Sequence, residues 1–122
     1  MAYDVHIVRT DDWLDAAKDP VTKQDVDELI ASDPDLAWST EDWVDMRDGR
    51  GKKVTRYFMI LWKGQPCFWW YRDQIKCAGP SEEQVGKMVE MAATLTANVL
   101  GDDGEAYRPA TWRAMYRGEL RE

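Results

Sequence analysis

Few side chains in this sequence are of the types that do chemistry. It has one histidine, His6, and two cysteines, Cys67 and Cys77. A zinc site needs several Cys or His ligands, and no CxxC spacing occurs. His6 would have to serve any Ser-His-Asp or Cys-His arrangement, but it falls in a segment that alternates like a strand, where a solvated or hydrogen-bonded histidine is expected. No glycine-rich phosphate loop is present. We therefore expect no catalytic residue.

Acidic residues form the other candidate for chemistry. Asp102, Asp103 and Glu105 surround Gly104, but they do not match the calcium-loop pattern of acids at alternate positions before a glycine and a later glutamate. A pair of carboxylates for glycoside hydrolysis could come from any of the 23 acidic residues, and nothing singles out a pair. We predict no enzyme activity, no metal and no cofactor.

Charge is spread unevenly along the chain. The net charge is −7, and residues 1–48 hold 14 acidic against four basic residues. An acidic half repels nucleic acid and favours basic partners. The C-terminal tail is basic and interleaves arginine with aromatic residues, which can bind single strands, but we expect it to fold onto the acidic half. These residues are Arg108, Trp112, Arg113, Tyr116, Arg117 and Arg121.

Neither a membrane span nor a secretory signal is visible in the sequence. No apolar run approaches the ~20 residues of a span, and the N-terminus lacks a basic start followed by an apolar stretch. The sequence predicts a cytoplasmic protein with no membrane or nucleic-acid partner.

Periodicity predicts an α+β fold. Strands are expected at 3–7, 36–38, 41–46, 54–62, 67–71 and 75–77, and one helix is expected after an N-cap at Thr22. A second helix begins with the capping box Ser81–Gln84 and carries an apolar stripe to Val99, with Gly101 as its C-cap. The order is β-α-β-β-β-β-α plus a tail. We expect an antiparallel sheet of four to five strands with both amphipathic helices on one face. Residues 1–107 form a single domain. Residues 108–122 form a basic tail that can include a short helix packing on this domain.

Seven tryptophans make the sheet unusually aromatic, and both faces of the hairpin around Lys63-Gly64-Gln65-Pro66 are apolar. Placing Trp62 opposite Cys67 assigns one set of residues to the core beneath the helices: Tyr57, Met59, Leu61, Phe68, Trp70, Ile75 and Cys77. The second face then holds Phe58, Ile60, Trp62, Cys67, Trp69, Tyr71 and Lys76. The tail, a second copy or a foreign partner could cover it. The two cysteines fall on opposite faces, so we expect no disulfide.

Several segments resemble a widespread group of small uncharacterised bacterial proteins. They are the opening YDVHIVRTDDWLDAAKDPVT, the helix end ASDPDL, the Trp-rich middle strands and the late LGDDGEAY, and the similarity covers residues 2–107. Members of such groups are similar to cytoplasmic immunity proteins, which bind and neutralise a toxin delivered by neighbouring cells. The resemblance carries over no catalytic residue.

Together these features predict a non-catalytic binding protein of immunity type that masks the active site of a toxin with a basic surface. Buried aromatic anchors and steering charges are what such an inhibitor needs. The expected partner-binding residues are Asp42, Trp43, Asp45, Trp69, Tyr71, Asp102 and Asp103. The alternative is a homo-oligomeric structural or regulatory module whose second sheet face is its own dimer interface.

Overall fold

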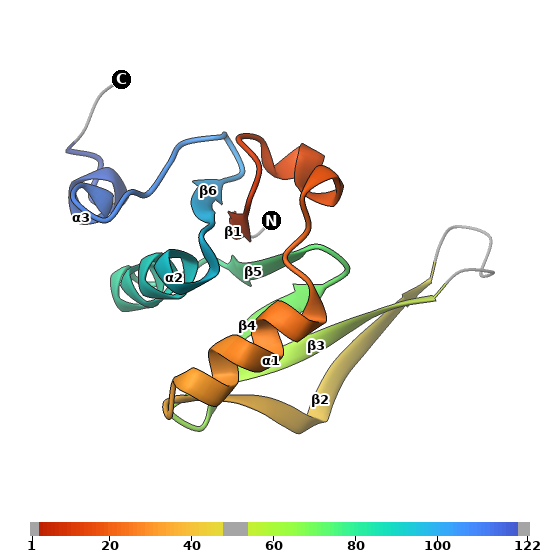
Figure 1. The fold of residues 1–122 in the computed structure, drawn as a ribbon. Coiled ribbons are helices and arrows are strands. Elements are labelled where there is room, and N and C mark those ends of the chain that lie inside the picture. Colours follow the sequence, from red (N-terminus) through yellow and green to blue (C-terminus); the bar gives the residue numbers. More distant parts are fainter. Residues whose placement is uncertain (1–2, 48–53, 120–122) are drawn as a thin grey trace.

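The computed structural model describes residues 3–47 and 54–119, with side chains for 3–40 and 56–119. Six strands form one antiparallel sheet in the order β2-β3-β4-β5-β1-β6 (Figure 1). The elements along the chain are β1 (Asp4–Val8), the 3-10 helix η1 (Trp13–Lys18), α1 (Lys23–Ser32), β2 (Leu36–Arg47), β3 (Val54–Trp62), β4 (Gln65–Tyr71), β5 (Gln74–Ala78), α2 (Glu82–Leu95), β6 (Asn98–Gly101) and α3 (Trp112–Tyr116). The α+β class is confirmed, but the sheet has six strands rather than four to five.

The additional strand comes from a segment that the sequence assigned to the second helix. Thr96 adopts a left-handed conformation, with φ of 53°, and ends α2 after Leu95. The next residues pair with β1 as β6, so Val99 lies opposite Ile7 and Gly101 opposite Val5. Val99 is buried, as predicted, but it reaches the core from a strand. The expected helix to Gly101 is therefore wrong.

Local helix signals were predicted correctly. Thr22 caps α1 and Ser81 caps α2, and in each case a reciprocal capping box forms, with Asp25 and Gln84 at the third helical position. The two short strands expected at 36–38 and 41–46 are one strand, β2, whose pairing with β3 is irregular between Trp38 and Trp43. That irregularity interrupts the alternation of side chains along the strand, which is why the sequence predicted two strands instead of one.

Both longer helices cover one face of the sheet. The main core joins Val26 and Leu29 of α1 and the apolar stripe of α2 to alternate residues of the strands beneath them, including Phe68, Trp70 and Ile75. On the opposite face, Ala16 of η1 packs only against Val8 and Leu100, with Trp13 beside them. The chain therefore covers one face fully and the other at one end.

The strand register corrects the predicted face of β3. Lys63 and Gly64, both at positive φ, form a two-residue turn that pairs Trp62 with Gln65, not with Cys67. The turn is thus two residues shorter than predicted, which alone would leave the faces unchanged. Cys67, an extra residue without a partner in β3, reduces the difference to one residue over the rest of the hairpin, and this moves the side chains of β3 to the other face. Phe58, Ile60 and Trp62 thus pack on the helix side, while Tyr57, Met59 and Leu61 occupy the second face.

The β4–β5 turn is also displaced, but by two residues. Trp70 pairs with Ile75 instead of Cys77. Because side chains alternate with a period of two, this shift leaves Phe68, Trp70, Ile75 and Cys77 on the predicted core face.

The C-terminal segment lies on the helix layer. Trp112 and Met115 pack against the main core, and Arg113 and Arg117 pair with Glu82 of α2 at 3.7 Å and 2.6 Å. The expected docking of these arginines on the acidic half is therefore wrong, and α3 does not cover the second face of the sheet (Figure 1). In the described part of the chain, no helix is long and apolar enough to cross a membrane.

The docking of Trp112 depends on Gly86, where a Cβ would lie 2.9 Å from the indole ring. Glycine to alanine in a helix interior usually stabilises by about 1 kcal/mol. We expect Gly86→Ala to lack this stabilisation, because the added methyl group would meet the Trp112 ring. In a Trp112→Ala background, Gly86→Ala should stabilise by the full amount. Urea unfolding of the four proteins measures the difference, expected at about 1 kcal/mol or more. Equal stabilisation by Gly86→Ala in both backgrounds would contradict this packing.

Candidate functional site

The most distinctive surface is the part of the second sheet face that η1 leaves uncovered. We call it the open face; it consists of Tyr57, Met59, Trp69, Tyr71 and Lys76. These residues come from three adjacent strands: Met59 pairs with Trp69, and Trp69 pairs with Lys76. Met59 is buried among its neighbours and the other four are half-buried. Their large side chains therefore shield one another without a covering helix.

A stacked tyrosine pair lies at the centre of the open face. The rings of Tyr57 and Tyr71 are parallel within 3°, with centroids 4.1 Å apart. The Lys76 ammonium lies 5.3 Å from both centroids, which is within cation–π distance. Burial, reinforced by the charge of Tyr57 and a hydrogen bond with it, raises the pKa of Tyr71 to about 12. Both rings are held in one geometry and present a rigid aromatic surface.

Trp69 differs from three tryptophans whose indole N–H groups are used within the chain. The indole N–H groups of Trp13, Trp38 and Trp70 each donate a hydrogen bond within the chain. That of Trp69 has no acceptor among the residues that the structure describes. A half-buried tryptophan with an unused donor is the kind of side chain that is enriched in interface anchors.

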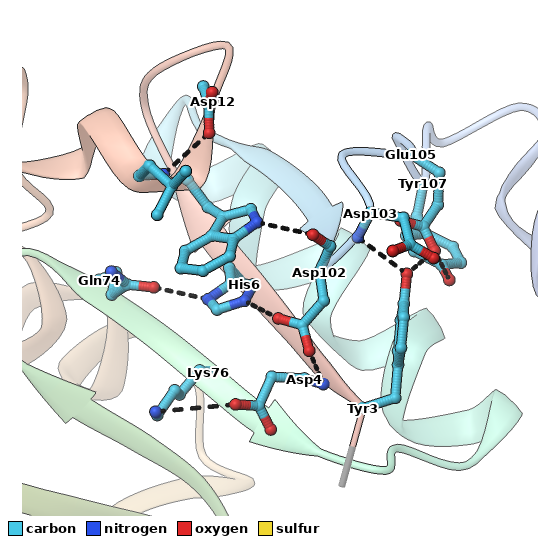
Figure 2. A network of polar contacts seen from close by, with 12 residues as sticks. Tyr3, Asp4, His6, Asp12, Gln74, Lys76, Asp102, Asp103, Glu105 and Tyr107 are labelled. Atoms are coloured by element: carbon cyan, nitrogen blue, oxygen red, sulfur yellow. Dashed lines mark hydrogen bonds and ion pairs between the residues drawn. The ribbon is translucent and has the colours of Figure 1, made fainter. Parts of the chain in front are cut away.

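A polar network borders the open face at β1 (Figure 2). His6 is 3% exposed, and its two ring nitrogens lie 2.7 Å from Gln74 Oε1 and 2.8 Å from Asp102 Oδ1. Asp102 also accepts a hydrogen bond from the backbone N–H of Asp4, whose side chain pairs with Lys76 at 3.8 Å. The network therefore connects β1, the first residue of β5 and the loop after β6, and it reaches the tyrosine pair through Lys76.

Trp13 covers the histidine. The two rings are stacked with centroids 4.4 Å apart, and the indole N–H donates to the backbone carbonyl of Asp102. Both ring nitrogens of His6 lie within hydrogen-bond distance of a side-chain oxygen. Its polar atoms are occupied and its face is covered, so the geometry suits His6 for holding strands together.

Asp102 is the anionic end of this network. Burial alone would raise its pKa, but the hydrogen bonds from the Asp4 N–H and from His6 outweigh burial, so the pKa lies below its ordinary value of 3.8. The carboxylate is thus stabilised in its charged form at neutral pH.

The adjacent acidic loop is closed on itself. Glu105 accepts hydrogen bonds from the hydroxyls of Tyr3 and Tyr107, and the backbone N–H of Asp103 donates to Tyr3. Glu105 Oε1 is buried and has no hydrogen-bond partner. Among the described residues, no group of three or more His, Cys, Asp or Glu side chains is placed to hold a metal ion.

The structure places the predicted site residues in three regions. Trp69 and Tyr71 share the open face, and Asp102 and Asp103 lie in the loop at its border. The others lie on β2, where Trp43 pairs with Phe58 and Asp45 with Arg56. The side chains of Asp42, Trp43 and Asp45 lie outside the described residues.

Two of the five residues of the open face, Tyr57 and Met59, were assigned to the core instead. A two-residue turn alone would also have placed them there, on the face of Phe68 and Trp70. The unpaired residue Cys67 is what moves them to the open face.

Replacing Asp102 by Asn should destabilise the fold by about 1–2 kcal/mol at neutral pH, since hydrogen bonds to a charged group are lost. Because folding lowers the pKa of Asp102, its carboxylate stabilises the folded protein above about pH 3.8. This stabilisation is lost as the pH falls through the pKa of the folded state. The difference between wild type and variant should therefore shrink in acid. Asp103→Asn, at the exposed neighbour, is the control and should leave stability unchanged. Urea unfolding at several pH values measures both, and a difference that is constant with pH would contradict the assignment.

The chain was compared with protein-family models, curated proteins and solved structures, and no match was found in any of the three.

Proposed function

We propose that this is a non-catalytic binding protein whose open face contacts another protein. The observation that carries the proposal is the half-buried aromatic surface of Tyr57, Trp69 and Tyr71, which no described helix covers. Aromatic residues with an adaptable methionine are enriched in interface cores, and hot spots are enriched in Trp and Tyr. The rigid stacking of the tyrosine pair lowers the entropy lost on binding.

The charges around the open face favour a basic partner. Asp4, Asp102 and Asp103 lie on β1 and in the loop after β6, and Asp73 lies in the turn between β4 and β5. The single cation within the face, Lys76, is paired with Asp4. The whole chain carries a net charge of −7. A surface of this kind steers a positively charged protein toward its aromatic centre.

Among basic partners, we favour a bacterial toxin whose active site the open face would mask in the cytoplasm. The resemblance over residues 2–107 to small bacterial proteins, of a kind that is similar to immunity proteins, supports this choice. An inhibitor that masks an active site needs an anchor and complementary charge, and it needs no catalytic group.

A homodimer through the same face is the alternative, and the charges disfavour it. In a two-fold dimer the same patch meets itself, so the acidic borders of both copies would be brought together. We therefore expect the isolated protein to be a monomer in light scattering at low salt.

Trp69→Ala tests the proposal most simply. Removing a central indole should weaken binding to the toxin encoded by the adjacent gene by about 30-fold or more, as expected for a hot spot. Tyr116→Ala is the matched control, because Tyr116 is an aromatic residue with 39% exposure on α3, away from the open face. Titration calorimetry with the purified toxin, together with inhibition of its activity, measures the effect. A toxin that is neither bound nor inhibited, or that binds Trp69→Ala as tightly as wild type, would refute the proposal.

A further inference from the structure

The two cysteines lie together, although the sequence placed them on opposite faces. Ile60 of β3 pairs with Phe68 and Leu61 pairs with Pro66, so Cys67 is an extra residue without a partner in β3. Such a bulge redirects the side chain of the inserted residue. Cys67 accordingly packs against the helix-side core, which contains Cys77.

The neighbouring strand places Cys77 next to this bulge. Trp69 pairs with Lys76 in the β4–β5 ladder, and one further step along the same antiparallel register brings Phe68 opposite Cys77. Each thiol influences the ionisation of the other, as expected of close neighbours. Both cysteines are free in the structure, and they lie on adjacent strands within one cluster.

We infer that Cys67 and Cys77 are a covalent modification site, a dithiol that closes reversibly to a cross-strand disulfide when a small-molecule disulfide oxidises it. The site is independent of the proposed partner. It would join β4 to β5, the two strands that carry Trp69, Tyr71 and Lys76 of the open face.

The surroundings assign different roles to the two thiols. Cys67 is half-buried and Cys77 is 3% exposed, so an oxidant reaches Cys67 first. The hydrogen bond from Cys77 lowers the pKa of Cys67, whereas the same hydrogen bond and burial raise the pKa of Cys77. The accessible thiol is thus also the one more readily ionised, and the thiolate is the attacking species.

The reaction proceeds in two exchanges. The Cys67 thiolate attacks one sulfur of glutathione disulfide, which breaks that S–S bond, forms a mixed disulfide at Cys67 and releases one glutathione. Cys77 then loses its proton and attacks the Cys67 sulfur, which forms the Cys67–Cys77 bond and releases the second glutathione. The protein loses two electrons and two protons, and glutathione disulfide is reduced to two thiols.

Equilibration of the full-length protein in glutathione buffers of graded oxidation state tests the inference. Free thiols are then alkylated and counted by intact mass spectrometry. We expect both thiols to disappear together, with a single peptide-mapped Cys67–Cys77 link, no disulfide-linked dimer, and full recovery on reduction. Loss of only one thiol, a disulfide-linked dimer, or two thiols that persist even in fully oxidised glutathione would overturn the inference.

Two variants separate the roles of the cysteines. Cys77→Ser should accumulate a stable glutathione adduct on Cys67, because the resolving thiol is absent. Cys67→Ser should leave Cys77 unmodified, because that thiol is buried. A glutathione adduct on Cys77 in folded Cys67→Ser, with folding checked by circular dichroism, would contradict the assigned order. The wild-type thiol count decides the central point even if either variant fails to fold.

Discussion

The architecture depends on an imbalance between the sheet and its helices. The middle strands present large apolar side chains on both faces, yet α1 and α2 both pack on one of them. On the other face, η1 reaches only the β1 and β6 end, where Ala16 meets Val8 and Leu100. Large aromatic side chains stabilise such surfaces most when they are removed from contact with water. Over β3 to β5 the chain shields them by packing them on one another, which leaves an organised aromatic surface.

The His6 network gives this surface a fixed border. It connects β1, the first residue of β5 and the loop after β6 through Gln74 and Asp102, and Trp13 covers His6. Lys76 extends the network to the tyrosine pair. A binding surface whose side chains are already positioned loses less entropy on association. The polar cluster that first suggests chemistry is thus better suited to holding the aromatic face in place.

What could be predicted from the sequence was set by local interactions. The capping boxes at Thr22 and Ser81 depend on residues three apart, and the alternation around Trp70 depends on one strand. The failures required knowledge of other strands. Val99 fits a helix stripe as well as a strand opposite Ile7. The bulge at Cys67, which decides the face of β3, exists only in the pairing of β4 with β3. Of the expected site, Trp69 and Tyr71 were placed correctly on the second face, whereas Tyr57 and Met59 were not.

The central claim is that the open face is where a partner binds. Isotope-labelled protein observed by nuclear magnetic resonance, alone and with the product of the adjacent gene, tests it directly. The account predicts that the Trp69 indole N–H signal shifts and that amides of β3, β4 and β5 gain protection from hydrogen exchange, while the Trp112 indole signal on α3 stays in place. Changes confined to Trp112 and the α2–α3 surface, with Trp69 unaffected, would contradict it.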